Sequence, residues 1–308
     1  MTDNAKEAAP EKFSVIKSEI FYNFSLVTYA CVIVLGIFGN DISIYLLGSK
    51  EKLRKAVGSI ANLMLSLSLV DFMTCSLMIP MYLFRGFFRQ YFENPIFCEL
   101  VFSTYIFWAF GGTSGCHLTF ISIDRYITVC HPMFHRTYWN KKFVSIALVM
   151  LAYFIGFGIS VSWLFMLHHV QDGKCVSKPD FFEKWRFYIG FHNFIIDLCV
   201  PTSVMASLYL LIYIKLKRKG SSGGKAAARG SAAVIRTALV TGFTYIACVA
   251  PNKTIWWMHC VRIWEVSFDE WPIYATHVLV ALNSCCNPII YTFSIETFRK
   301  EFFSLLKF

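Results

Sequence analysis

The chain has 308 residues, of which 56% are hydrophobic and only 16% are charged, and its mean hydropathy is +0.53. This composition excludes a soluble globular domain, in which about a quarter of the residues are charged. The formal net charge of +10 would suit a nucleic-acid partner, but most basic residues lie in short loops beside apolar runs, where positive charge keeps a loop in the cytosol. We therefore expect one polytopic membrane domain and no nucleic-acid partner.

The first part of the chain predicts a polar tail followed by two membrane spans. Residues 1–17 have no apolar core, so we expect no cleavable signal, and we expect residues 1–21 to form an extracellular tail. The apolar runs over about 24–47 and 58–84 are long enough for helices that cross a bilayer, which need about 20 residues each. The basic stretch Lys50–Lys55 between them predicts a cytosolic loop and so places the N-terminus outside.

The run from Cys98 to Tyr126 is the centre of the predicted bundle. Small residues that let neighbouring helices approach closely fill its middle: Gly111, Gly112, Ser114 and Gly115. The run ends in Asp124-Arg125-Tyr126, where the membrane interior should stop. A charge at that depth is costly unless it is paired or functional. We interpret this run as a central helix with a switch at its inner end.

Four further apolar spans complete the predicted fold. They cover about 143–167, 185–216, 233–261 and 271–293. The Gly- and Ser-rich stretch at about 219–231 predicts a flexible third inner loop. Residues 295–308 can place Phe298 and Phe302 on one face, which predicts an amphipathic helix on the inner leaflet. The predicted fold class is all-α membrane: a seven-transmembrane helix bundle over 22–294 with a short amphipathic eighth helix.

Motifs in order along these spans resemble those of the rhodopsin-like (class A) G protein-coupled receptors. Asp124-Arg125-Tyr126 is similar to the Asp-Arg-Tyr motif of that family, and Asn287-Pro288-Ile-Ile-Tyr291 is similar to its seventh-helix signature. Single residues in other spans also resemble its markers: Asn40, Asp71, Pro201, Tyr209 and Pro251. The resemblance covers about 27–302. It implies a receptor that transmits binding of an extracellular small molecule or peptide to a heterotrimeric G protein, with arrestin as a further partner.

The resemblance implies an activation switch at the inner end of the bundle. Arg125 would pair with Asp124 at rest and swing toward Tyr209 and Tyr291 on activation, which opens a cytoplasmic cleft for a G protein helix. The bland alternative is an arginine that only snorkels to the interface. Two prolines would act as hinges, because proline removes a backbone hydrogen bond, or else as static kinks: Pro251 and Pro288.

Asp71 is a carboxylate at the centre of the second span. Ser114, Asn283 and Ser284 stand where the family has its sodium ligands and their supports. The resemblance therefore implies an allosteric sodium ion, and the alternative is a buried acid kept neutral. We expect no other cofactor. Covalent retinal loses support because Ala281 stands where opsins have the lysine that binds it.

The resemblance also predicts a ligand pocket in the outer half of the bundle. The upper third helix is aromatic and uncharged there, with Phe107 about where aminergic receptors have an aspartate, so a simple monoamine loses support. The candidate pocket residues are Phe107, Trp108, Gly111, Asn193, Asp197, Asn252, Lys253 and His277. Because two lone buried charges are expensive, we expect Asp197 and Lys253 to pair. This pair is either structural or the point at which a ligand with polar or charged groups competes.

Cys98 and Cys175 are the cysteines placed at the outer face, where disulfides persist. The resemblance implies that they join the top of the third helix to the second outer loop, and two free thiols are the alternative. The spacing from Cys98 to Arg125 is slightly longer than is typical of the family, which predicts an irregular upper third helix.

The predicted function is that of a receptor in the plasma membrane, with membrane lipids as partners. Two other classes of protein are alternatives. A seven-helix transporter or a photoreceptor-like protein is the alternative, although no internal repeat is visible and no lysine lies between Trp271 and Phe293. An enzyme finds no support, because neither a nucleophile elbow nor a metal-ligand spacing of His and Cys occurs in the sequence.

Overall fold

The structure is a computed structural model that describes residues 4–83, 94, 98, 104–166, 168–171, 174–177, 179–219, 225–266 and 271–305. The elements are, in chain order, helices α1 (Asn4–Ser49), α2 (Glu51–Val57), the 3₁₀ turn η1 (Gly58–Ile60), α3 (Ala61–Met78), the π-helical turn η2 (Ile79–Leu83), α6 (Tyr105–Cys130), α7 (Pro132–Phe134), the π-helical turn η5 (His135–Trp139), α8 (Lys142–Met166), strands β1 (His168–Gln171) and β2 (Lys174–Ser177), α9 (Pro179–Phe194), the π-helical turn η6 (Ile195–Cys199), α10 (Val200–Lys219), α11 (Lys225–Cys260), α12 (Trp271–Ser294) and α13 (Glu296–Leu305).

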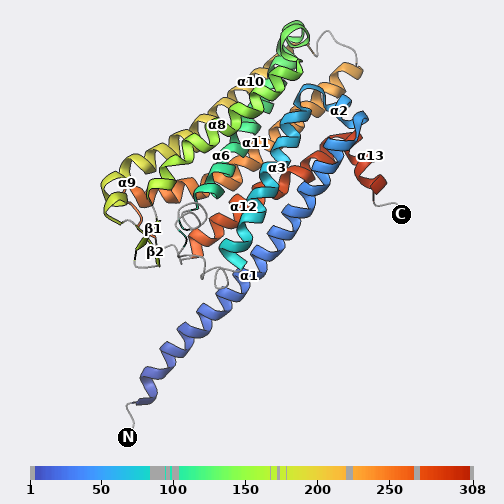
Figure 1. Cartoon of the computed structure of the whole chain (residues 1–308). Coiled ribbons are helices and arrows are strands. Elements are labelled where there is room, and N and C mark those ends of the chain that lie inside the picture. The colour runs from blue at the N-terminus through green and yellow to red at the C-terminus, as the bar shows by residue number, and fades with distance from the viewer. Residues whose placement is uncertain are drawn as a thin grey trace.

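The long helices lie side by side in one bundle with α6 at its centre (Figure 1). α6 contacts α3, α8, α10 and α11, whereas α1 packs on α3 and α12. The start of α1 and the two strands lie toward one end of the bundle, and α2 and α13 lie at the other (Figure 1). The predicted seven-helix bundle with a short C-terminal helix is confirmed.

Among the described residues, six helical segments are long and apolar enough to cross a membrane. One of them is continuous from α9 through η6 to α10. The seventh predicted span lies in α11, whose outer half contains Pro251, Asn252 and Lys253. These two polar side chains are buried. The polar residues of α11 therefore face the bundle interior and not lipid.

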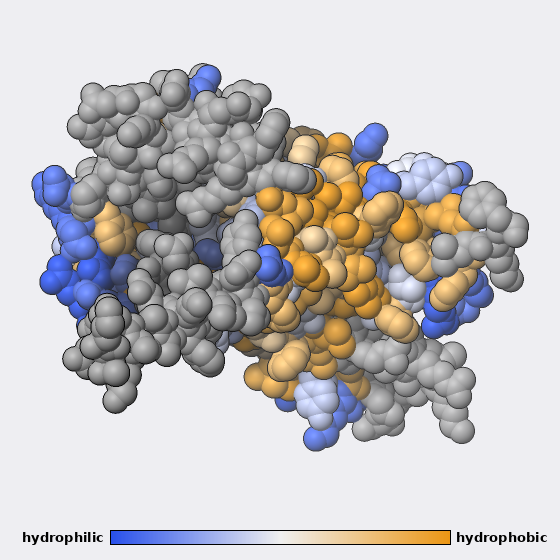
Figure 2. Space-filling view, turned by 90° about the horizontal axis from the view of Figure 1, so that it is seen from below, coloured by the Kyte–Doolittle hydropathy of each residue, from blue (hydrophilic) through white to orange (hydrophobic). Residues whose placement is uncertain are grey.

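Large hydrophobic side chains cover the outside of the bundle. Five phenylalanines on four spans are 64–80% exposed: Phe38, Phe143, Phe154, Phe243 and Phe293. Figure 2 shows hydrophobic residues gathered across the middle of one face, with hydrophilic residues toward its edges. An apolar surface of this extent is unfavourable in water and is suited to lipid tails.

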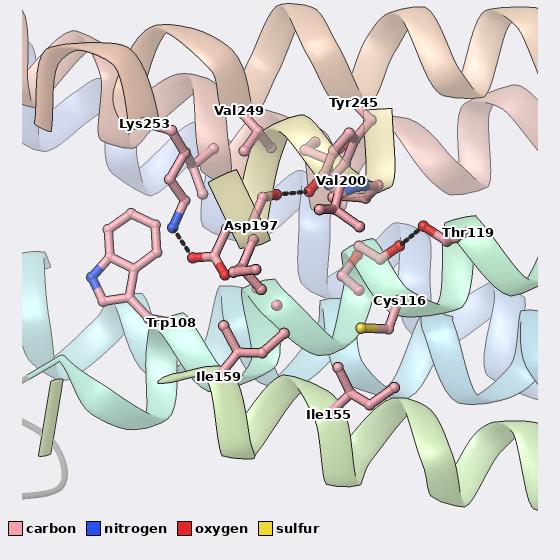
Figure 3. A pocket seen from close by; sticks show the side chains of 18 of the residues that line it. Trp108, Cys116, Thr119, Ile155, Ile159, Asp197, Val200, Tyr245, Val249 and Lys253 are labelled. Atoms are coloured by element: carbon pink, nitrogen blue, oxygen red, sulfur yellow. Dashed lines mark hydrogen bonds and ion pairs between the residues drawn. The ribbon is translucent and has the colours of Figure 1, made fainter. Parts of the chain in front are cut away.

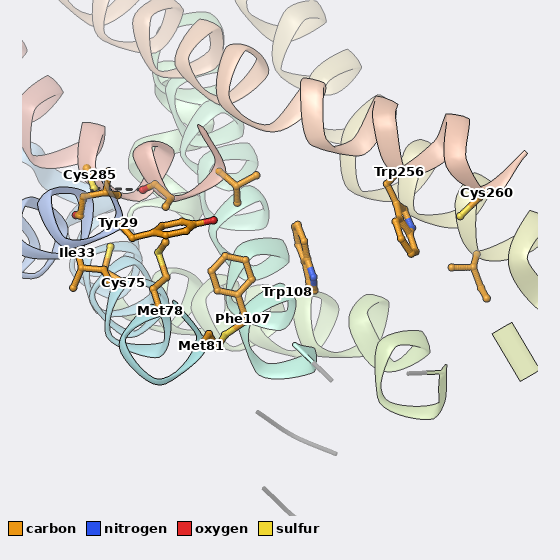
Figure 4. Close-up of a cluster of buried hydrophobic side chains, with 14 residues drawn as sticks. Tyr29, Ile33, Cys75, Met78, Met81, Phe107, Trp108, Trp256, Cys260 and Cys285 are labelled. Carbon is orange, nitrogen blue, oxygen red and sulfur yellow. Dashed lines mark hydrogen bonds between the residues drawn. The ribbon is translucent and has the colours of Figure 1, made fainter. Parts of the chain in front are cut away.

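The described residues form three hydrophobic clusters inside the bundle. One of them contains Tyr29, Phe107, Trp108 and Trp256 (Figure 4). A second cluster joins Phe298 of α13 to Tyr291 of α12, and a third surrounds Tyr209. Gly156 allows the close approach of α6 and α8, since a Cβ there would overlap the backbone of α6 at Thr113. The same clusters hold the helices that carry the candidate site.

The structure differs from the sequence expectations at several boundaries. α1 starts at Asn4, so residues 4–21 of the expected tail are helical and continuous with the first span. α11 starts at Lys225, inside the expected inner loop, because three alanines follow and alanine is the strongest helix former. α13 covers Glu296–Leu305 and buries Phe298. The second outer loop contains an antiparallel hairpin, in which Val170 pairs with Cys175.

The upper third helix is irregular, as the sequence predicts. α6 starts only at Tyr105, directly after Thr104. Thr104 has φ +62°, in the left-handed region, which an α-helix of L-residues does not continue through. Cys98 therefore lies outside α6.

Candidate functional site

Asp197 lies on the π-helical turn η6, four residues before Pro201. Because proline has no N–H, the carbonyl of Asp197 loses its helical hydrogen-bond donor. The hydroxyl of Tyr245 on α11 donates to this carbonyl instead, at 2.8 Å (Figure 3). The proline and the tyrosine together fix the backbone that presents the Asp197 carboxylate.

Asp197 and Lys253 form a tight ion pair between η6 and α11. Nζ of Lys253 donates to Oδ2 of Asp197 at 2.6 Å, and the two side chains are only 6% and 9% exposed. The ammonium also lies 4.4 Å from the ring centroid of Trp108, which is a cation–π arrangement. Oδ1 of Asp197 is buried without a hydrogen-bond partner among the described residues. The predicted pairing of these two charges is confirmed.

A cavity of about 220 Å³ adjoins this ion pair (Figure 3). Four of the residues predicted for the ligand pocket line it: Trp108, Gly111, Asp197 and Lys253. The sequence reasoning missed the apolar walls, which come from four helical segments: Cys116, Ile155, Ile159, Ile196, Val200 and Val249. The glycines of α6 were the available signal, because residues without side chains leave space next to their helix.

The other four predicted pocket residues do not line this cavity. Phe107 packs edge-to-face on Trp108, with ring centroids 5.3 Å apart. Nδ2 of Asn193 donates to the carbonyl of Ile189 at 3.0 Å. The remaining two residues are hydrogen-bonded to neighbouring helical segments. Asn252 bonds to Thr276 at 3.1 Å, and His277 bonds to Tyr82 at 3.3 Å. Successive helical residues point in different directions, so Asn252 leaves the face that Lys253 occupies.

Asp71 lies in the middle of the bundle and is fully buried. Ser114 donates to its Oδ1 at 3.1 Å, Nδ2 of Asn287 donates to its Oδ2 at 2.7 Å, and the Ser284 hydroxyl is a further hydrogen-bond partner. Asn283 lines the outer cavity together with Ser114 and Ser284. A carboxylate with serine hydroxyl oxygens beside it offers the oxygen donors that a hard cation prefers. These residues therefore fit a sodium ion.

Asn40 joins α1 to α12 one turn before Pro288. Pro288 cannot donate to the carbonyl of Ser284, and Nδ2 of Asn40 donates to that carbonyl at 2.9 Å. The same amide nitrogen also donates to the carbonyl of Gly36 at 2.8 Å. The two family markers Asn40 and Pro288 thus act on one backbone group, next to Asp71.

Asp124 at the inner end of α6 is held mainly by residues other than Arg125. Ser59 donates to its Oδ1 at 2.7 Å, and Nε1 of Trp139 donates to the same oxygen at 3.0 Å. Nε2 of His135 lies 3.6 Å from Oδ1. Nε of Arg125 lies 3.8 Å from Oδ2, which makes no hydrogen bond among the described residues. The expected pairing of Asp124 with Arg125 is present but long.

Arg125 borders a second cavity, of about 310 Å³. Its Nη2 donates to the carbonyl of Val57 at 3.1 Å. Tyr209 and Tyr291 line the same cavity, whereas the hydroxyl of Tyr126 lies 3.4 Å from Nε2 of His131. Tyr209 is hydrogen-bonded to Ser122, and Tyr291 packs on Phe298 with ring centroids 5.8 Å apart. The two tyrosines line the cavity beside Arg125 but are not hydrogen-bonded to Arg125.

Sequence reasoning missed three partners of Asp124: Ser59, His135 and Trp139. Trp139 and His135 both lie on η5, which follows α6 by only a few residues. Their signal in the sequence was weak, because a loop can place its side chains on either side of the helix before it. The structure brings this inner loop onto the carboxylate.

Cys98 is disulfide-bonded and fully buried. Cysteines on the spans are free thiols, including Cys75 and Cys285. The side chain of Cys175 lies outside the described residues, so its pairing with Cys98 stays a prediction.

Comparison with known proteins agrees with the resemblance in the motifs. The model of the family described as 7 transmembrane receptor (rhodopsin family) matches residues 39–291. Somatostatin receptor type 5 of Bos taurus is 27% identical over 292 residues, which cover 91% of this chain and 75% of that receptor. Somatostatin receptor type 4 of Rattus norvegicus is 23% identical over 309 residues, which cover 97% of this chain and 78% of that receptor.

Trace amine-associated receptor 5 of Rattus norvegicus is 29% identical over 270 residues, which cover 79% of this chain and 74% of that receptor. The matches do not favour the transporter or photoreceptor-like alternative, and the matching family is a class of receptors rather than of enzymes. The chain belongs to the rhodopsin family of seven-transmembrane receptors and is a multi-pass G protein-coupled receptor.

Proposed function

We propose that an extracellular ligand enters the outer cavity, acts on the Asp197–Lys253 ion pair and thereby opens the inner cavity to a G protein helix. The observation that carries this proposal is that the same elements border both cavities. α6 contributes Trp108 to the outer cavity and Arg125 to the inner one. The ion pair joins η6 to α11, and these two segments continue to Tyr209 and Thr241 at the inner cavity.

The ion pair acts as a latch between these two segments. A ligand that hydrogen-bonds to the carboxylate competes with Lys253 for it and weakens the 2.6 Å contact that ties η6 to α11. The segments then separate more easily at their inner ends, next to Tyr209. Arg125 leaves Asp124 and turns into the enlarged cavity, where Tyr209 and Tyr291 already line the wall.

The experiment measures GTPγS uptake by purified heterotrimers with the receptor in nanodiscs. Lys253→Met removes the latch contact, and Asp197→Asn weakens it because an uncharged amide oxygen then faces the ammonium, so both should raise basal uptake. Arg125→Ala should abolish uptake in all backgrounds. A ligand library screened by G protein dissociation should give agonists whose potency changes at least tenfold in Lys253→Met. Unchanged basal uptake together with unchanged potency contradicts the latch.

Sodium binding at Asp71 is part of the proposal. The carboxylate with Ser114, Asn283 and Ser284 would hold the ion, which supplies a positive charge to a buried acid when bound. Support comes from the oxygen donors around Asp71 and from the outer cavity, which reaches Ser114 and Asn283. Replacing potassium chloride by sodium chloride should raise the melting temperature of the wild type and leave the melting temperature of Asp71→Asn unchanged. An equal rise in both proteins contradicts the site.

We further place the receptor in the plasma membrane with its N-terminus outside and with arrestin and membrane lipids as partners. The basic stretch Lys50–Lys55, next to the inner cavity, supports this orientation. An epitope at the N-terminus should stain in intact cells, whereas one after Phe308 should stain only after permeabilisation. Recruitment of labelled arrestin after agonist addition tests the second partner.

A further inference from the structure

We propose that the outer cavity binds an uncharged small molecule whose hydroxyl or amide N–H donates to Oδ1 of Asp197 and whose apolar body lies between α6, α8 and α10. This inference rests on the proposed function, because it names the chemical class of the ligand for the same cavity. It depends on three features: the charge balance of the cavity, one unused acceptor, and the glycine-made space beside Trp108.

The charge of the cavity wall is balanced. Asp197 and Lys253 are the only charged residues among the described residues that line it, and they already neutralise each other. An ammonium or carboxylate ligand would bring a net charge into an apolar space that offers no net countercharge. The desolvation of such a charge is not recovered there. An uncharged ligand avoids this cost.

One carboxylate oxygen of Asp197 has no partner in the part of the chain that the structure describes. Oδ2 accepts from Lys253, whereas Oδ1 is buried and has no hydrogen-bond partner among the described residues. In Figure 3 the carboxylate of Asp197 lies between Lys253 and the space above Ile159. A buried acceptor without a donor is costly. A ligand O–H or N–H supplies that donor and shares the carboxylate with Lys253, which weakens the ion pair.

The rest of the cavity accepts an apolar body. Ile155 and Ile159 of α8 face Val200 of α10 across it (Figure 3). Gly111 leaves the space open, because a Cβ there would have no atom within 4 Å. The volume of about 220 Å³ corresponds to roughly seven water molecules. This space suits a small aromatic or aliphatic molecule, or one side chain of a larger ligand, and not a whole peptide.

The test uses three probes with one phenyl ring and different polar ends: 2-phenylethanol, 2-phenylethylamine and 3-phenylpropanoic acid. Their binding to the purified receptor in nanodiscs is measured by saturation-transfer NMR. We expect 2-phenylethanol to bind at least about tenfold more tightly than the ammonium and the carboxylate. Tighter binding of either charged probe, or no binding of any probe, overturns the inference. Basal GTPγS uptake needs no probe, so a failure here leaves the test of coupling intact.

Two glycines give a matched pair of variants. Gly111→Leu fills the cavity, whereas Gly158→Leu places the same side chain on an exposed position of α8 that also has no atom within 4 Å. We expect Gly111→Leu to abolish binding of 2-phenylethanol and Gly158→Leu to retain it. Partition of the probe into lipid would be the same for both variants. Retained binding in Gly111→Leu therefore overturns the assignment to this cavity.

Asp197→Asn inverts the hydrogen bonding of the site. Its amide oxygen must stay on Lys253, so its NH₂ group points into the cavity as a donor. 1-Phenylpropan-2-one, which can only accept, should bind weakly to the wild type and at least about fivefold more tightly to Asp197→Asn. No gain for the ketone overturns the role of Oδ1. A circular dichroism spectrum like that of the wild type shows that the variant is folded.

Discussion

The outer and inner ion pairs of this receptor are built in opposite ways. Asp197 and Lys253 come from segments far apart in the sequence, lie 2.6 Å apart, and each is the main charged partner of the other. Asp124 and Arg125 are adjacent in the sequence and lie 3.8 Å apart. Each inner residue has other partners as well, including Ser59 for Asp124 and the carbonyl of Val57 for Arg125.

This difference decides what happens when each pair opens. Separation of the outer pair leaves two buried charges without partners, so it requires a ligand. Arg125 can leave Asp124 at a smaller cost, because Ser59 and Trp139 continue to donate to that carboxylate. The outer pair is suited to hold a state until a ligand arrives, and the inner pair is suited to change.

The largest effect is expected when one partner of the outer pair is removed. Lys253→Met leaves a buried carboxylate and should lower the stability by about 3–5 kcal/mol. The double variant Asp197→Leu/Lys253→Met removes both charges and should lose less than either single variant. Melting of the detergent-solubilised receptor measures both. A double variant that loses the sum of the single losses would show that the two residues act independently.

A smaller effect is expected at the backbone that carries Asp197. Tyr245→Phe leaves the carbonyl of Asp197 without a donor, because Pro201 has no N–H, and should cost about 1–3 kcal/mol. In a Pro201→Ala background the helix regains a donor at position 201, so the same substitution should cost clearly less. The two melting-temperature differences form a double-mutant cycle. Equal losses in both backgrounds would rule out this role of Tyr245.

The inner pair should respond less in stability and more in signalling. Asp124→Asn keeps an oxygen for Ser59 and Trp139 and removes the charge beside Arg125, so we expect a loss of about 1 kcal/mol. Basal GTPγS uptake should rise severalfold because Arg125 is released. Ser59→Ala, which keeps the charge, is the control and should raise uptake less. A large loss of stability without a rise in uptake would make Asp124 a structural residue.

The exposed pair on α13 should have the smallest effect. Lys300 donates to Glu296 at 2.7 Å, and this bond lowers the pKa of Glu296 below its ordinary value. A group whose pKa is lowered by folding stabilises the folded state at any pH above its unfolded pKa, which is about 4.3 for Glu. The stabilisation by Glu296 is therefore present at neutral pH and is lost as the pH falls through the lowered pKa of the folded state. Both groups are exposed, so Glu296→Gln should leave the melting temperature at pH 7 unchanged within error. A measurable shift at pH 7 would show that α13 contributes more to the fold than its exposure suggests.

Much of the candidate site was readable from single residues. Polar or helix-breaking residues inside long apolar runs need hydrogen-bond or charge partners in a membrane. Four such residues stood out in the sequence: Asp71, Arg125, Pro201 and Pro288. The same reasoning predicted that Asp197 and Lys253 pair. It did not find Tyr245, Ser59 or Trp139, because nothing in an apolar helix or a polar loop shows which neighbour a hydroxyl or an indole N–H will reach.

The sequence by itself predicted the membrane spans and their order, because hydrophobic length and charged loops act locally along the chain, and its motifs carried the resemblance to the receptor family. Only the tertiary structure decided which pocket residues share one cavity, since this depends on how each helix is rotated about its axis. It placed Lys253 and Gly111 on the cavity and turned Asn252 and His277 to other helices. It also gave the orphaned carbonyls of Asp197 and Ser284 their donors, because a backbone group freed by proline must find a partner across the bundle.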